Sequence, residues 1–275
     1  MSSAAVAIPL GQNRATGRIV LAAHAVDGVT RRTRVYEGGS FRVRFPNVAG
    51  SACEAVLLNT AGGMAGGDRL DVALTAGAGA HLVFTSAAAE KIYRSLGEDS
   101  AVAVRIDASA GATLAWLPQE TILFDQARLS RRIDIDLADD ASLVMAEAVV
   151  FGRMAMGEAV HRGRLIDRWR IRRNGRLIFA ETMRLDGAIA TTLDLTAVTA
   201  RATAVATLLL APGTDVQVAQ VRDLASDLGS EIGASAWNDI AVVRLCARSD
   251  AALRHDLAAI LAALYPQSLP RVWLH

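Results

Sequence analysis

Three segments of the chain repeat one simple pattern, in which an alternating strand is followed by a tight turn of small residues and then by a second strand. They span residues 71–84, 104–116 and 135–145. Each second strand has a leucine near its start, and these leucines recur about every thirty residues, a spacing typical of stacked β-coils. The pattern predicts a solenoid-like or sandwich stack of two sheets, and not a doubly wound nucleotide-binding fold. The three leucines are Leu82, Leu114 and Leu143.

The rest of the first 195 residues also shows the two-residue alternation of short strands. The dipeptide at 174–175, Asn-Gly, is the strongest hairpin signal, because both central residues of a type I′ turn need positive φ. The strand before it places Leu165, Trp169 and Ile171 on one face and a row of arginines on the other. We interpret this row as a solvated face, with a protein-docking surface as the functional alternative. The row consists of Arg162, Arg164, Arg168, Arg170 and Arg172.

Residues 196–275 change to a mixed pattern. Apolar residues at helical spacing predict a helix over 215–228, and Ser249 is a suitable N-cap for a second helix that ends before Pro266. Between the helices, 231–237 and 240–246 have the pattern of a strand pair. We therefore expect a mainly β protein that forms a single domain over 1–275. A β-helix-like body of stacked sheets at 1–195 would pack against a small α+β portion with two helices at 196–275.

Composition restricts the possible partners and location. The formal net charge is +1, from 29 basic and 28 acidic residues, which gives no support for a nucleic-acid partner. Cys53 and Cys246 are far apart in the chain, and we interpret both as reduced, buried thiols. The first 18 residues lack the basic start of a secretory signal, and the apolar stretch 204–211 is too short to span a membrane. We expect a soluble cytoplasmic protein.

The segment 59–70 is rich in glycine and is the most unusual local sequence of the chain. One alternative is an enzyme with a small-molecule or nucleotide site at 61–70, but a phosphate-binding loop needs Gly-Lys-Ser/Thr and this segment has no lysine. The other is a backbone turn with several positive-φ positions, where a side chain would collide with a neighbouring strand. The five histidines are scattered and no nucleophile motif is present, so we expect no enzyme.

Glu120, Glu147 and Glu181 share the parity of nearby apolar residues, so strands that turn those residues inward would carry the glutamates into the core. A buried carboxylate is costly unless it is paired, hydrogen-bonded, protonated or bound to an ion. Each glutamate could pair with an interior arginine or a backbone N–H, or a bulge could rotate it outward. The alternative is a water-lined passage with acidic walls. Oxygen ligands alone hold a divalent ion weakly, which suits transit more than storage.

Several stretches together resemble one known family. They are 61–70 (AGGMAGGDRL), 85–95 (TSAAAEKIYRS), 117–125 (LPQETILFD), 151–158 (FGRMAMGE), the hairpin through 174–181, and the closing 269–273 (LPRVW). The likeness covers nearly the whole chain in the right order. On these motifs the chain is similar to the urease accessory proteins of the UreD (UreH) family.

This resemblance implies a non-catalytic scaffold that works with UreF and the GTPase UreG, docks on the urease apoprotein and assists nickel insertion. It implies no tightly bound cofactor, with nickel as an ion in transit. The residues that match family motifs are then candidates for partner contacts, for structural roles or for the ion path. Those assigned to contacts or structure are Gly62, Gly63, Gly66, Gly67, Asp68, Glu90, Tyr93, Arg94, Asp125 and Glu158; those assigned to a transient nickel path are Glu120, Glu147 and Glu181.

Overall fold

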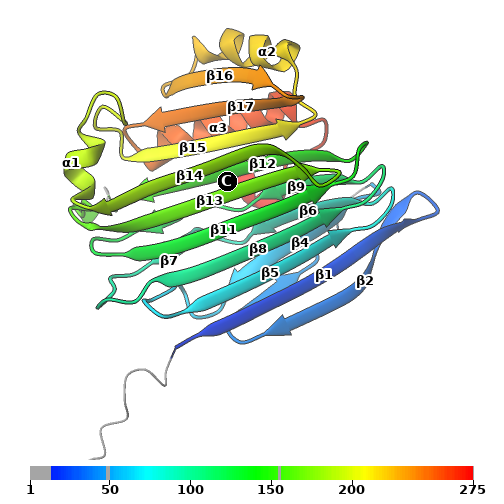
Figure 1. Ribbon diagram of the computed structural model, residues 1–275, viewed down its shortest axis with the longest axis horizontal. Coiled ribbons are helices and arrows are strands. Elements are labelled where there is room, and N and C mark those ends of the chain that lie inside the picture. The colour runs from blue at the N-terminus through cyan, green and yellow to red at the C-terminus, as the bar shows by residue number, and fades with distance from the viewer. Residues whose placement is uncertain (1–13, 48–49, 154–155, 275) are drawn as a thin grey trace, which may run out of the picture.

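The computed structural model describes residues 14–47, 50–153 and 156–274. The first 13 residues, two residues of the 151–158 motif (Met154 and Ala155) and His275 therefore lie outside the described residues. The described chain forms two facing β-sheets with a few short helices (Figure 1). The seven-stranded sheet has the order β14 (Arg176–Gly187), β13 (Gly163–Arg173), β11 (Arg128–Leu137), β8 (Ser100–Ala108), β5 (Arg69–Ala76), β1 (Thr16–Val26) and β2 (Val29–Gly38).

The second sheet has ten strands. Its main path has the order β16 (Glu231–Trp237), β17 (Ile240–Ala247), β15 (Ala204–Ala211), β12 (Ser142–Phe151), β9 (Thr113–Leu117), β6 (His81–Ser86), β4 (Cys53–Asn59) and β3 (Phe41–Arg44). Two short strands lie beside this path, β7 (Glu90–Ile92) and β10 (Thr121–Leu123).

The three sequence repeats form three stacked coils, which confirms the predicted stacked-sheet fold. Their first strands are β5, β8 and β11, which pair in parallel in the seven-stranded sheet, and their second strands are β6, β9 and β12 in the other sheet. Leu114 lies opposite Leu82 on one side and Leu143 on the other. All three are buried, so the repeat period corresponds to one ladder of leucines through the core.

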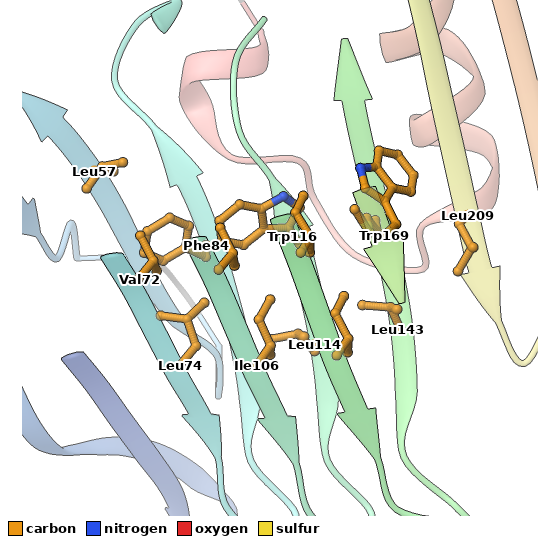
Figure 2. Packing of buried hydrophobic residues seen from close by; sticks show 14 of the residues in the cluster. Leu57, Val72, Leu74, Phe84, Ile106, Leu114, Trp116, Leu143, Trp169 and Leu209 are labelled. Carbon is orange, nitrogen blue, oxygen red and sulfur yellow. The ribbon is translucent and has the colours of Figure 1, made fainter. Parts of the chain in front are cut away.

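The main core lies between the two sheets. Figure 2 shows Val72 and Ile106 of the seven-stranded sheet, and Phe84, Leu114 and Trp116 of the ten-stranded sheet, all in this layer. The rings of Phe84 and Trp116 are stacked, with centroids 4.9 Å apart. Because the chain is poor in aromatic residues, small aliphatic side chains fill most of the layer, and the two sheets pack closely.

The C-terminal part confirms the two predicted helices and the strand pair between them, and β15 precedes the first helix. β15 pairs with β12, so residues on both sides of position 195 share one sheet. Helices α2 (Asp215–Ala225) and α3 (Asp250–Leu264) pack on the face of the ten-stranded sheet that points away from the main core, where they form a second apolar cluster. The Ser249 hydroxyl accepts a hydrogen bond from the N–H of Ala252, as expected for an N-cap.

Local details also follow or depart from the sequence patterns. Asn174 and Gly175 have φ of 46° and 73°, which confirms the two-residue turn between β13 and β14. A five-residue helix, α1 (Ile189–Leu193), occurs in a stretch where the pattern suggested only strands. Cys53 is buried, whereas Cys246 is only half-buried, and neither forms a disulfide. Among the described residues, no helix combines the length and the apolar character needed to cross a bilayer.

Candidate functional site

A small cavity lies in the core between the two sheets. Its volume is about 60 Å³ and its wall is mostly apolar. A cavity of this size can hold a few water molecules where polar groups give them partners. Three charged side chains reach its wall, namely Glu90, Glu147 and Arg131. The remaining lining residues are Leu57, Leu70, Val72, Phe84, Ser86, Ile92, Val102, Val104, Trp116, Pro118, Gln119, Thr121 and Leu129.

Glu147 lies on β12 and is 4% exposed. It shares the inward face with Met145, as its parity predicts. Its Oε1 accepts a hydrogen bond from the indole N–H of Trp116 at 2.7 Å, and its Oε2 forms an ion pair with Arg131. Both carboxylate oxygens of Glu147 therefore have partners within the protein.

Arg131 lies on β11 between two buried carboxylates. Its Nε donates to Oδ1 of Asp167 at 3.0 Å, and a second guanidinium nitrogen binds the other oxygen of Asp167. The indole N–H of Trp169 also donates to Asp167, at 2.9 Å. Burial raises the pKa of Glu147, Arg131 acts against this rise, and the charge of Asp167 adds to it. One guanidinium thus compensates two carboxylates in the core.

Sequence reasoning missed Arg131 and Asp167, although the signal for both was present. Arg131 precedes Ile133 by two residues and Asp167 precedes Trp169 by two, so each shares the parity of an inward apolar residue. Pairing with an interior arginine was one of the alternatives that the sequence left open for the inward glutamates. It is the alternative found at Glu147.

Glu90 on β7 differs from Glu147 because it forms no ion pair among the described residues, although the charge of the adjacent Lys91 lowers its pKa slightly. Its Oε1 accepts a hydrogen bond from the side-chain amide of Asn59 at 2.8 Å. Burial raises the pKa of Glu90 to about 7; the nearby charge of Asp68 adds to the rise, while the hydrogen bond from Asn59 opposes it. Near neutral pH, Glu90 is therefore a partly protonated carboxyl group on the cavity wall.

Gln119 adds an unsatisfied donor to the same wall. Its side chain is buried, its Oε1 accepts a hydrogen bond from Arg254, and its Nε2 has no hydrogen-bond partner among the described residues. The backbone N–H of Gln119 donates to the hydroxyl of Ser86 at 2.9 Å. A buried donor without a partner is costly, and a water molecule in the cavity would relieve that cost.

Glu120 does not lie on a strand. β9 ends at Leu117 and β10 begins at Thr121, so Glu120 falls in the connection between them. Its Oε2 pairs with Arg254 of α3 at 3.2 Å. The prediction that a strand carries Glu120 into the core is therefore wrong, because the alternation stops before it is reached.

Glu181 lies on β14 and shares the face of Phe179, as predicted, but it is at the edge of the seven-stranded sheet. Its two oxygens bind Arg244 of β17 at 2.7 and 3.0 Å. It lines a groove of about 230 Å³ that also includes Met183 and Cys246. Of the three glutamates assigned to a nickel path, only Glu147 lines the interior cavity.

The glycine-rich segment forms a turn packed against β7. Gly62, Gly63 and Gly67 have positive φ of 77°, 157° and 89°. A Cβ at Gly63 would lie 2.8 Å from the carbonyl oxygen of Lys91 and 2.5 Å from the ring of Tyr93. These contacts match the interpretation in which glycines allow close approach to a neighbouring strand.

Side chains around this turn also hold it in place. The two oxygens of Asp68 accept hydrogen bonds from the N–H groups of Ala15 and Ala65, both at 2.8 Å. The hydroxyl of Tyr93 donates to the carbonyl of Gly62 at 2.9 Å. A Cβ at Gly66 would lie 2.1 Å from the hydroxyl of Ser95. Neighbouring residues of the protein thus occupy the space around this turn.

A separate polar cluster contains Asp125 and Glu158. Asp125 accepts hydrogen bonds from the N–H groups of His161 and Arg162 at 2.8 and 3.0 Å. Partial burial would raise the pKa of Asp125, but these hydrogen bonds outweigh it and lower the pKa. Glu158 pairs with Arg153 at 2.5 Å. Nearby, the backbone of Arg94 forms an isolated bridge with that of Ala127. The cluster lies apart from the residues that line the interior cavity.

Comparison with known proteins gives a consistent result over most of the chain. Residues 15–274 match the family described as UreD urease accessory protein. The chain is 52% identical over 262 residues to the urease accessory protein UreD of Rhodopseudomonas palustris (strain BisB18), which covers 95% of each protein. It is 49% identical over 263 residues to the urease accessory protein UreD 3 of Bradyrhizobium sp. (strain BTAi1), which covers 96% of this chain and 95% of the relative. The chain therefore belongs to the UreD family of urease accessory proteins.

Proposed function

We propose that this protein is a cytoplasmic scaffold required for nickel insertion into urease, acting with UreF and UreG and docking on the urease apoprotein. It catalyses no reaction of its own and binds no cofactor tightly. Family membership supports the role in urease maturation. The observation that carries the ion-path part of the proposal is the cavity between the sheets, with Glu90 and Glu147 on its wall.

In this proposal, Glu90 is the carboxylate that meets the ion. Glu147 already binds Arg131, Glu181 binds Arg244 and Glu120 binds Arg254, so each of these three must first give up a basic partner. Glu90 has only neutral hydrogen-bond donors within the described chain. A divalent ion would displace the proton of Glu90 and favour its charged form.

The chemistry of the wall suits brief contact. Among the described residues, no three His, Cys, Asp or Glu side chains gather as a metal site. A single carboxylate with amide and hydroxyl oxygens binds nickel weakly, because first-row divalent ions of this kind bind nitrogen and sulfur ligands more tightly. Glu90 and Ser86 therefore supply oxygen atoms for an ion that passes through.

The test is complementation of a deletion strain, with urease activity and nickel content measured at matched protein levels. Deletion is expected to lower both quantities, and the wild-type gene to restore them. Glu90→Gln is expected to reduce nickel content more than Glu98→Gln does. Glu98 is the matched control because its side chain is 71% exposed and, within the described residues, forms only a long ion pair of 3.8 Å with Arg14.

Two outcomes would contradict different parts of the proposal. Full nickel content in the deletion strain would end the scaffold role. Normal nickel content with Glu90→Gln and also with the double variant Glu147→Gln/Glu181→Gln would end the ion path and leave the scaffold role standing. Co-purification of the tagged protein with UreF, UreG and urease tests the partners separately.

A further inference from the structure

The outer face of the seven-stranded sheet is uncovered in the described part of the chain. Helices α2 and α3 pack against the ten-stranded sheet, and Figure 1 shows the seven-stranded sheet from its outer side with no helix across its strands. The residues on this face point away from the core, so the fold does not need their charges. The charges of these residues are therefore informative about contacts with other molecules.

Strand register collects arginines into one region of this face. In three neighbouring rows that run across the strands, seven arginines face outward with only two aspartates. We call this region the basic belt. Its charged members are Arg18 and Asp71 with Arg132 and Arg168 in one row, Arg69 and Arg184 in the row on one side, and Arg105, Asp134 and Arg170 in the row on the other.

The basic belt is a local excess in a chain with a net charge of only +1. The rows beyond it are balanced or slightly acidic. On one side, Arg128 and Arg164 share Asp99. On the other, Asp107 and Asp136 lie in the same row as Arg172, and burial together with the charge of Asp136 raises the pKa of Asp107. Positive charge is therefore concentrated where the belt lies.

Most of the belt arginines have no carboxylate within ion-pair distance in the described residues. Arg132 pairs with Asp134 and Arg184 with Asp186. The guanidinium of Arg170 donates only to backbone carbonyl groups. The other four, which form no ion pair within the described chain, are Arg18, Arg69, Arg105 and Arg168.

One pairing in the belt opposes folding. Arg132 on β11 lies directly opposite Arg168 on β13, and like charges directly opposite each other destabilise a sheet. An anionic partner above the two guanidinium groups would remove this repulsion. The unbound sheet therefore contains a repulsion that lowers its stability, which is expected of a surface that binds an acidic molecule.

The belt also has a hollow that fits an acidic side chain. A depression of about 260 Å³ lies between Arg18 and Arg105, above Ala73 and Ala103. Asp71 also lines it, so the two arginines leave an excess of one positive charge around the hollow. The two alanines leave space over the strands, and the two arginines at its sides form no ion pair in the part of the chain that the structure describes. An arginine fork binds a carboxylate through two parallel hydrogen bonds, so this hollow can receive a glutamate or aspartate side chain.

We propose that the basic belt docks a carboxylate-rich surface of a partner protein. A protein is favoured over a nucleic acid because the chain has a net charge of only +1, without the basic excess that nucleic-acid binding normally needs. The belt rows include a single exposed aromatic side chain among the described residues, Tyr36 opposite Val20, which is too few for a run of stacked bases. The aspartates within the belt also oppose a continuous phosphate backbone. This proposal goes beyond the scaffold function above and does not depend on the interior ion path.

The test measures binding of the purified full chain to fluorescent poly-L-glutamate at about 50 and 200 mM salt, with poly-uridylate RNA as a second probe. The belt variant is Arg105→Glu/Arg168→Glu. The control variant is Arg31→Glu/Arg248→Glu, which makes the same change in net charge at two exposed arginines outside the belt. Thermal unfolding checks that each variant is folded. If the belt variant fails to fold, Arg105→Gln/Arg168→Gln replaces it.

Wild type is expected to bind poly-L-glutamate, and more weakly at the higher salt concentration. The belt variant is expected to weaken this binding at least about tenfold, because reversed charges repel the acidic probe, whereas the control changes it less than about threefold. With the glutamine variant, the loss of poly-L-glutamate binding is expected to be smaller but still larger than the loss in the control variant. Three results would overturn the proposal: no binding of poly-L-glutamate, equal loss in both double variants, or tighter belt-dependent binding of the RNA.

Discussion

Arg131 and Glu147 belong to opposite sheets, and their side chains meet in the core as an ion pair. Arg131 projects from β11 and Glu147 from β12, which are consecutive strands of one coil. Asp167 of the neighbouring β13 holds the same guanidinium. Three successive strands are thus linked through one buried arginine, at the wall of the cavity to which we assign the ion path.

Replacing Glu147 by glutamine is expected to lower the free energy of unfolding by about 3 kcal/mol, because the change leaves a buried guanidinium with less compensation. Asp167 remains bound to Arg131, which keeps the loss near the lower end of the range for broken buried pairs. Urea unfolding monitored by circular dichroism measures the change. The control is Glu181→Gln, whose ion pair with the half-exposed Arg244 is expected to contribute less than about 1 kcal/mol. Equal losses in the two variants would contradict this view of the core.

The raised pKa of Glu90 predicts a pH dependence of stability. The folded protein retains a proton on Glu90 up to a pKa of about 7, whereas the unfolded chain releases it near the ordinary value of 4.5. Between these values the folded state binds more protons, so this contribution to stability is complete below pH 4.5 and falls as pH rises toward 7. The loss amounts to at most about 3 kcal/mol.

The measurement for Glu90 is the difference in unfolding free energy between wild type and Glu90→Gln at several pH values. A glutamine cannot ionise, so the variant lacks this part of the pH dependence. Relative to its own value at pH 4.5, the variant is expected to retain more stability than wild type at pH 8. Parallel pH profiles of the two proteins would show that Glu90 is not destabilised by burial.

Leu114 is the middle member of the leucine ladder. Truncation of Leu114 to alanine removes contacts with Leu82 and Leu143 and leaves a cavity in a layer that is fully buried. The expected loss of unfolding free energy is about 2–5 kcal/mol. Leu177→Ala is the control, since Leu177 is 48% exposed, and its expected effect is below about 1 kcal/mol. Chemical denaturation of both variants gives the comparison, and a similar small loss at both positions would argue against the stacked coil.

Alanine substitutions at two neighbouring glycines distinguish the cost of backbone strain from the cost of steric collision. A Cβ at Gly62 meets nothing within 4 Å, so Gly62→Ala is expected to cost only the strain of positive φ, about 1–2 kcal/mol. A Cβ at Gly63 collides with the carbonyl of Lys91 and the ring of Tyr93, so Gly63→Ala is expected to cost more than Gly62→Ala. Thermal unfolding of the two variants measures the difference. The opposite order would refute the packing described for this turn.

Much of the architecture could be predicted because it follows from local patterns. The alternation of Val104 and Ile106, the Asn174–Gly175 turn and the cap at Ser249 depend on residues close together in the chain. The recurrence of leucines also predicted the stack, since each coil repeats the same short-range preferences. The resemblance of the motifs indicated the family, which the comparisons then showed.

The site was less predictable. The strand alternation correctly predicted that Glu147 faces inward. It could not show that Arg131 and Asp167 surround Glu147, because these residues meet across two sheets. Parity failed at Glu120, where the strand ends early. The short strand that carries Glu90 was also not resolved by pattern, because three residues are too few to show alternation.

What the sequence by itself determined is therefore the kind of fold, several turns and caps, and the family. The tertiary structure alone decided which charges meet: Arg131 with Glu147 in the core, and Arg132 beside Arg168 in the basic belt. The physical reason is that alternation and turn preference act between neighbours in the chain. Lateral register and the facing of two sheets instead depend on the packing of the whole core, which brings together residues that are distant in sequence.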